Sequence, residues 1–208
     1  MMGVTQMADN VAEHSSDTAA AIIAGGQATR FGGQDKSRLN ISGQSIISRQ
    51  VAALQPLSGE IFIVANQYER FAGTGLRVCP DLFPGTGVIG AIGTALESTP
   101  ADRVLTVACD LPFLTTALLR RLLELAADAD ASWVRTESGA EPLIACYRRQ
   151  AAPSIRAAIE AGQLRATDLD RILDIRSMGS DELQTLGDPA RLLANINSPE
   201  DLGTIASS

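Results

Sequence analysis

A glycine-rich stretch that also carries an arginine and a lysine follows an early apolar run of the chain. The run covers residues 20–24, and it is followed by Gly25-Gly26, Arg30, Gly32-Gly33 and Lys36. Glycines let backbone N–H groups line a concavity, while arginine and lysine add positive charge at two depths. Such a loop suits a nucleoside triphosphate. A glycine pair alone is more often a tight turn, but the added cations favour ligand binding.

The spacing within this loop matches neither of two common nucleotide-binding motifs. In GxxxxGK[ST] the lysine directly follows the second glycine, whereas Lys36 lies three residues after Gly33. The loop also lacks the GxGxxG spacing, because Gly25 and Gly26 are adjacent. The sequence therefore predicts an anion-binding loop of another class.

Two aspartates stand at the ends of later apolar runs. Asp110 ends the run 103–110 and precedes Leu111-Pro112, and Asp81 ends the shorter run 77–81. In open α/β sheets, ligands bind outside the carboxyl ends of the strands, so both could face the glycine loop. A carboxylate there could hold Mg²⁺, which bridges phosphates and keeps several waters. Capping of the following turn is an equally good interpretation of Asp110, and Asp81 has the same ambiguity.

Three further polar residues are candidates for substrate contact. Glu141 precedes Pro142 at the start of an apolar run, where capping and substrate contact compete. Asn195 and Asn197 alternate around Ile196, which would place both on one side of a last short strand. Capping of the terminal turn is the alternative for this pair.

The hydrophobic patterning predicts one α/β domain with a mainly parallel sheet. Ser45 can cap a helix in which Ile47, Val51 and Leu54 share one face, and further helices are expected around residues 92–96, after Thr115 and after Pro153. Residues 163–190 are polar and irregular apart from a short helix at 167–173. The expected strands cover residues 20–24, 60–66, 77–81, 103–110, 131–135, 142–147 and 192–197.

Composition excludes several classes of function for this 208-residue chain. The net charge of −7 argues against general affinity for nucleic acid or anionic membranes. His14 is the single histidine, which nearly excludes histidine-based catalysis, and the three cysteines form no CxxC pair that could hold zinc. No apolar stretch is long enough to span a bilayer. We expect a cytoplasmic protein with a disordered tail over residues 1–18 and one domain over residues 19–208.

Several motifs in order along the chain resemble a known family. They are similar to the signature of the molybdenum cofactor guanylyltransferase (MobA) family, within the nucleotidyltransferases of glycosyltransferase-A-like fold. The resemblance implies a three-layer, Rossmann-like sandwich of the nucleotide-diphospho-sugar transferase type. The Ala-Gly-Gly step resembles the guanylyl branch, whereas the related cytidylyltransferases typically carry Ala-Ala-Gly. The matching residues are Ile23-Ala24-Gly25-Gly26, Arg30, Gly32-Gly33, Asp35-Lys36, Cys109-Asp110-Leu111-Pro112 and Asn195-Ile196-Asn197-Ser198-Pro199-Glu200-Asp201-Leu202.

The resemblance implies roles for individual residues. GTP and molybdopterin would be the substrates, and molybdoenzymes or other cofactor-biosynthesis proteins could make transient contact. Catalysis would fall to Arg30 on the triphosphate, Lys36 on phosphate and Asp110 as the Mg²⁺ ligand. The residues that would contact GTP are Ile23, Ala24, Gly25, Gly26, Asn66 and Asp81, and those towards molybdopterin are Glu141, Asn195 and Asn197.

Two departures from the family pattern bear on base recognition more than on phosphate binding. The family's Gly-Pro-Leu-Ala-Gly segment reads Gly87-Val88-Ile89-Gly90-Ala91 here, and Val64 stands where relatives often have Asn. The alternatives are therefore a nucleotidyltransferase that uses CTP or acts on a sugar phosphate, and a non-catalytic nucleotide- or cofactor-binding relative. Retained Lys36 and Asp110 favour the enzyme, because simple binding could dispense with a metal.

Overall fold

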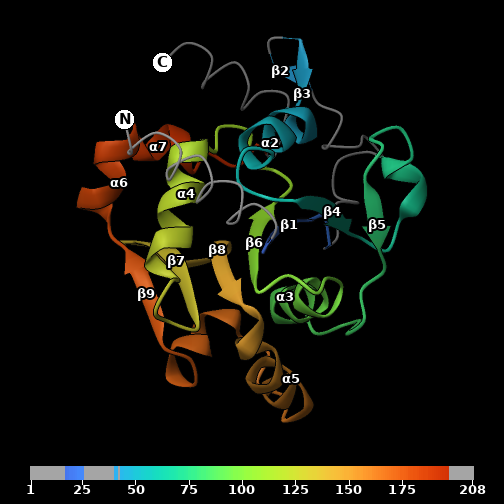
Figure 1. Ribbon diagram of the computed structural model, residues 1–208, viewed down its shortest axis with the longest axis vertical. Helices are drawn as coiled ribbons and strands as arrows, with labels where there is room; N and C mark the ends of the chain where they lie inside the picture. Colours follow the sequence, from blue (N-terminus) through green and yellow to red (C-terminus); the bar gives the residue numbers. More distant parts are fainter. Residues whose placement is uncertain (1–16, 26–39, 42, 197–208) are drawn as a thin grey trace, which may run out of the picture.

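The computed structural model describes residues 17–25, 40–41 and 43–196 of the chain (Figure 1). Within these residues a seven-stranded mixed sheet forms the centre, in the order β5-β4-β1-β6-β8-β7-β9. A separate hairpin pairs β2 (Asn40–Ile41) with β3 (Gln44–Ser45). The strands of the central sheet are β1 (Thr18–Ile23), β4 (Glu60–Val64), β5 (Arg77–Cys79), β6 (Arg103–Ala108), β7 (Ala131–Thr136), β8 (Gly139–Arg148) and β9 (Ile175–Met178).

Helices cover both faces of the sheet and complete three layers. Alternate residues of β1 face opposite ways, so Ala20 and Ile22 pack in one core while Ala19, Ala21 and Ile23 pack in the other. The first core contains α2 (Ile46–Leu54), α4 (Thr116–Leu125), α6 (Ser180–Leu186) and α7 (Pro189–Leu192). The second contains α3 (Val88–Glu97), α5 (Ala152–Glu160) and the 3₁₀ turn η5 (Ala166–Arg171), and the short turns η3 (Tyr68–Phe71) and η4 (Arg149–Ala151) complete the elements. The predicted three-layer α/β sandwich is confirmed.

The parallel part of the sheet brings four strand ends to one edge. Strands β5, β4, β1 and β6 are parallel neighbours, and Ile23 is in register with both Val64 and Ala108. Val64 in turn pairs with Cys79. The residues that follow these positions therefore emerge together, as expected for the ligand-binding edge of an open α/β sheet.

The other half of the sheet departs from this pattern. Strand β8 runs antiparallel to both β6 and β7, and β7 pairs in parallel with the edge strand β9. Because β8 runs against β6, its amino-terminal end lies beside the carboxyl end of β6. Residues near the start of β8 are thereby placed at the same edge as Asp110.

Local capping follows the predicted helix starts. The Ser45 hydroxyl accepts a hydrogen bond from the Ser48 backbone N–H at 3.1 Å, and the Thr115 hydroxyl accepts one from Leu118 at 3.3 Å. None of the described helices is long and apolar enough to cross a membrane.

The prediction of a strand over residues 192–197 was wrong. Pro189 occupies the first turn of α7, and the Asp188 carboxylate accepts a hydrogen bond from Ala190 N at 3.1 Å, so this stretch begins as a helical turn. Residues 194–196 follow it without strand pairing. The polar stretch 163–190 holds β9 and α6 as well as the expected short helix.

The first strand of the sheet begins inside the range predicted for the tail, residues 1–18. Strand β1 begins at Thr18, which is 1% exposed, one residue before the predicted boundary. Residues 1–16, on which the predicted tail falls, lie outside the described part of the chain.

Candidate functional site

A first pocket, of about 490 Å³, opens at the carboxyl ends of the parallel strands. Ile23 and Gly25 line it after β1, Asn66 after β4 and Asp81 after β5. A Cβ built on Gly25 would meet no atom of the described residues within 4 Å. Ala24 is partly buried beside it, and its N–H donates to Val64 O at 2.9 Å. The structure therefore brings Ile23, Gly25, Asn66 and Asp81, all predicted to contact the nucleotide, together in this pocket.

Asn66 and Asp81 are held in this pocket by a short hydrogen-bond network. The Asn66 Oδ1 atom accepts the Asp81 backbone N–H at 2.9 Å. The Asp81 Oδ1 atom accepts the Phe83 backbone N–H at 2.9 Å and the Thr94 hydroxyl at 3.0 Å. None of the described residues bonds to Asn66 Nδ2 or Asp81 Oδ2. One donor and one carboxylate acceptor therefore remain for a ligand.

Thr94 is a site residue that sequence reasoning missed. It is fully buried on the otherwise apolar core face of α3, and its hydroxyl also accepts the Leu82 N–H at 3.0 Å. The sequence offered one signal, a polar threonine among the apolar residues of the helix. It could not identify the partner, Asp81, which lies 13 residues earlier in the chain.

The loop between β5 and α3 is the glycine-rich segment that departs from the family pattern, and its spacing is a signal that the sequence prediction did not use. Residues 85–90 have the spacing GxGxxG between a strand and a helix. Gly85 and Gly87 adopt φ values of 83° and 72° and line the first pocket. A Cβ on Gly90 would lie 2.9 Å from Phe83 O, so the helix packs too closely against the loop to admit a side chain. These glycines let backbone form one wall of the pocket.

A second pocket, of about 400 Å³, adjoins the first and shares Val88 and Leu143 with it. Asp110, Glu141 and Asn195 line it together, from the turn after β6, from β8 and from the segment after α7. Arg165 lines the same pocket. The antiparallel insertion of β8 is what brings Glu141 beside Asp110.

Burial raises the pKa of Glu141, because the half-buried carboxyl loses water that would solvate its charge. The sequence left capping and substrate contact open for this residue. Its position in the second pocket agrees with substrate contact.

Asn195 reaches this pocket by a different route from the one expected. The Ile196 backbone N–H donates to Asp110 O at 3.0 Å, and the fully buried Ile196 side chain packs with Ile41 and Ile46 against Phe113. The segment is anchored by this contact and not by strand pairing. The prediction that Asn195 and Asn197 share one side of a strand is therefore wrong for Asn195, which lies in no strand. Asn197 lies outside the described residues.

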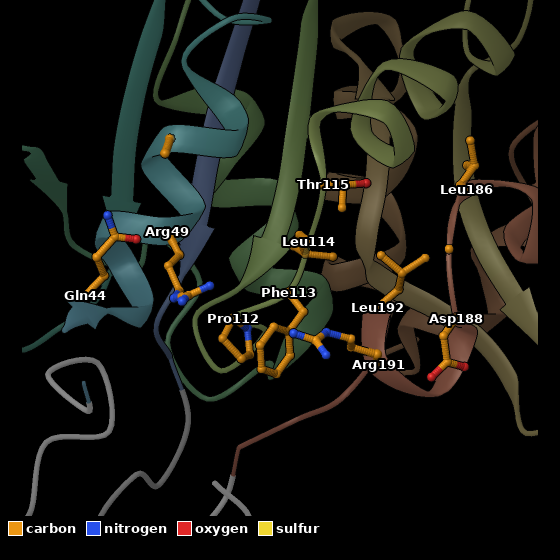
Figure 2. Close-up of a pocket in the computed structure, with 12 residues that line it drawn as sticks. Gln44, Arg49, Pro112, Phe113, Leu114, Thr115, Leu186, Asp188, Arg191 and Leu192 are labelled. Carbon is orange, nitrogen blue, oxygen red and sulfur yellow. The ribbon is translucent and has the colours of Figure 1, made fainter. Parts of the chain in front are cut away.

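A third pocket, of about 460 Å³, lies between α2, α7 and the segment that follows Asp110 (Figure 2). The guanidinium carbons of Arg49 and Arg191 lie 6.0 and 4.9 Å from the centre of the Phe113 ring. Figure 2 shows both arginines directed towards Phe113, while the Asp188 carboxylate points away from them. Cation–π contact with both groups holds Phe113, and thereby the segment carrying Asp110, against α2 and α7.

Several predicted residues cannot be placed. Gly26, Arg30 and Lys36, which would bind phosphate, lie outside the described ranges. Outside the first two pockets, Arg148 and Arg149 bond to Asp102 and to the Thr99 carbonyl near the start of β6. Among the residues that the structure places, no three His, Cys, Asp or Glu side chains gather into a metal cluster.

Comparison with known proteins identifies the family. The MobA-like NTP transferase domain matches residues 20–175. The chain belongs to this family. A relative named molybdenum cofactor guanylyltransferase, from Shewanella baltica strain OS155, is 30% identical over 92% of this chain and 97% of its own length. The family resemblance predicted from the motifs is confirmed, and the chain is a nucleotidyltransferase by family.

Two solved structures share the fold of this MobA-like chain. Molybdopterin-guanine dinucleotide biosynthesis protein A from Archaeoglobus fulgidus superposes with a TM-score of 0.73 at 23% identity, covering 91% of this chain and 97% of that one. The 2-C-methyl-D-erythritol 4-phosphate cytidylyltransferase from Thermus thermophilus gives 0.62 at 17% identity, covering 92% and 98%. A protein named for guanine dinucleotide biosynthesis and one named a cytidylyltransferase thus share this architecture, so the fold alone does not select the base.

Proposed function

We propose that the protein transfers GMP from GTP to molybdopterin, forming the guanine dinucleotide cofactor and pyrophosphate. The observation that carries the proposal is a pair of adjoining pockets at one sheet edge, with Asp110 in one and Asn66 and Asp81 in the other. Two adjoining pockets suit a reaction that joins two substrates. Relatives named molybdenum cofactor guanylyltransferase over nearly the whole chain supply the substrate classes.

The first pocket would hold the nucleoside of GTP. The Asn66 amide offers a donor and the Asp81 carboxylate an acceptor. Guanine presents the complementary pair, an O6 acceptor beside an N1–H donor. Ile23, Ala24, Gly25 and Gly26 would contact the nucleotide through the backbone, with Arg30 and Lys36 on the phosphates.

Asp110 would hold Mg²⁺ at the boundary between the two substrates. Asp110 and Glu141 supply carboxylates to the same pocket. Mg²⁺ in nucleotide enzymes binds through one or two carboxylates and completes its shell with phosphates and water, so this oxygen donor set fits. When bound, the ion would offset negative charge on the triphosphate.

The residues of the chain would act chiefly by positioning and charge neutralisation. The molybdopterin phosphate attacks the α-phosphorus of GTP, a new phosphoanhydride bond forms, and the bond to pyrophosphate breaks. Asn66 and Asp81 fix the nucleoside, while Asn195 and Glu141 orient the acceptor. Arg30 and Lys36 neutralise charge on the transferred and leaving phosphates. Such a transfer requires no covalent intermediate on the protein, which agrees with a chain of one histidine.

The guanine dinucleotide cofactor would then be transferred to the proteins that require it. We place this step in the cytoplasm, where a reducing environment suits the buried thiols of Cys79 and Cys146. Molybdoenzymes or other cofactor-biosynthesis proteins would be transient partners.

The test combines the purified protein, Mg²⁺ and molybdopterin with GTP or with CTP, and follows pyrophosphate release. We expect release with GTP and little with CTP. Equal or greater release with CTP would assign the protein to the cytidylyl class. Nucleotide binding with no release from either would mark it as a non-catalytic relative.

A further inference from the structure

Helix α2 carries one polar side chain on its buried face. The buried residues of this helix are Ile46, Ile47, Gln50, Ala53 and Leu54, and Gln50 is only 1% exposed. An amide among aliphatic neighbours must find hydrogen bonds or lose free energy. The partners of Gln50 therefore indicate what it does.

Both partners of Gln50 flank Asp110. The Gln50 Nε2 atom donates to Ala108 O at 2.7 Å and to Leu111 O at 3.0 Å. Ala108 is the last residue of β6, and Leu111 is the first residue after Asp110. One amide group thus joins the two ends of the short segment that carries the aspartate. Carbonyl oxygens can be met only by a donor, which fixes which end of the amide faces the segment.

One end of the Gln50 amide is unsatisfied. Its Oε1 atom is buried and accepts no hydrogen bond from any residue that the structure describes. That unbonded acceptor carries a free-energy penalty, whereas an apolar side chain in its place would leave the carbonyls of Ala108 and Leu111 without this donor. The two hydrogen bonds from Gln50 Nε2 order the Asp110 segment, while the unbonded Oε1 atom destabilises the core around α2.

Other contacts restrain the same segment from different directions. The Cys109 N–H donates to Ile23 O and the Ile196 N–H donates to Asp110 O, both at 3.0 Å. Arg49, the neighbour of Gln50 on α2, contacts the ring of Phe113, three residues after Asp110 (Figure 2). Among the described side chains, Gln50 alone bonds to the backbone on both sides of Asp110.

We propose that Gln50 is a positioning residue that sets the orientation of the Asp110 carboxylate for metal–nucleotide binding. The inference rests on the function proposed above, because it assumes that Asp110 binds Mg²⁺. Gln50 itself touches neither substrate nor metal. Its effect is expected on metal affinity and kcat, while the nucleoside contacts of Asn66 and Asp81 stay in place.

The test compares Gln50→Met with Thr116→Val. Methionine keeps the length of glutamine and removes both N–H donors. Thr116 donates from its hydroxyl to Ala53 O of the same helix at 2.9 Å, so its valine variant loses a hydrogen bond to α2 without touching the Asp110 segment. For each variant, Mn²⁺ binding to the protein–GTP complex is titrated by electron paramagnetic resonance, and kcat, KM for GTP and the melting temperature are measured.

We expect Gln50→Met to weaken Mn²⁺ binding and to lower kcat by about 10- to 100-fold, the range that a misplaced catalytic group can cause. KM for GTP at saturating metal should stay close to that of the unmodified protein. Thr116→Val should lower only the melting temperature. If Gln50→Met fails to fold, Gln50→Asn, which keeps the amide but cannot reach both carbonyls, serves for the same measurements.

Two kinds of contrary result are distinguishable. Unchanged Mn²⁺ affinity and kcat in a folded Gln50 variant, with both lost in Asp110→Ala, would overturn the positioning role and leave the proposed function standing. Retained Mn²⁺ binding and turnover in Asp110→Ala would overturn the metal assignment itself, and the inference on Gln50 with it.

Discussion

Replacing Thr94 by valine should weaken GTP binding, although Thr94 is buried beneath the pocket. Valine has nearly the same shape, so the change removes the hydroxyl and little else. Two contacts are lost: the hydrogen bond donated to Asp81 Oδ1 and the one accepted from Leu82 N, both 3.0 Å long. Asp81 then keeps only the Phe83 N–H on that oxygen.

The size of the effect follows from those two contacts. A hydrogen bond to a charged group contributes about 1.5–3 kcal/mol, and an ordinary one such as that from the part-buried Leu82 N–H contributes about 0.5–1.5 kcal/mol. If about 1.4 kcal/mol of this loss appears as disorder of Asp81 in the pocket, KM for GTP rises roughly tenfold. The remainder lowers the melting temperature by about 2–4 °C per kcal/mol.

The assay measures KM for GTP and the melting temperature, with Thr18→Val as the matched control. Thr18 is 1% exposed on β1, and its hydroxyl has no hydrogen-bond partner among the described residues. Its valine variant should therefore be as stable as the unmodified protein or more stable, with unchanged kinetics. A Thr94→Val protein that is less stable but binds GTP normally would refute the argument that Thr94 orients Asp81 for the nucleotide.

Three further changes test other parts of the site. Asp110→Ala should abolish Mg²⁺-dependent turnover and leave circular dichroism intact, whereas near-normal turnover would contradict the metal role. Lys36→Ala should raise the Kd for GTP measured by calorimetry, and an unchanged Kd would count against phosphate contact. Burial raises the pKa of Glu141 above its ordinary 4.5, so the folded state binds its proton more tightly than the unfolded chain. Stability from this group is therefore full below pH 4.5 and is lost as pH rises through the raised pKa. Glu141→Gln should flatten that part of the melting-temperature profile, and an unchanged profile would show that Glu141 is not its source.

The sequence by itself determined the strands that carry the site and the polar residues that end them. Apolar runs closed by glycine, an amide or a carboxylate predicted β1, β4, β5 and β6, and parallel pairing of such strands brings their ends to one edge. Asp81 and Asp110 were predicted as site residues in this way, whereas Asn66 was predicted from the family resemblance. This signal is local, because it depends on side-chain periodicity over a few residues.

Other parts of the fold were missed because their local patterns are weak. Strand β9 is half exposed at the sheet edge, and its residues Ile175–Met178 include an arginine and a serine, so its pairing with β7 supplies what its composition lacks. The last segment reads as a strand, but Pro189 and the Asp188 cap begin a helical turn first. Asn195 then reaches the site through the buried Ile196.

Only the tertiary structure decided which groups support the candidate site. Gln50 bonds to carbonyls 58 and 61 residues away, and Thr94 meets Asp81 across 13 residues. Glu141 joins Asp110 because β8 runs antiparallel beside β6. A polar residue on a buried helix face shows in the sequence as an interruption of the apolar pattern. Its partner is fixed by packing between remote segments, and periodicity along the chain carries no record of that.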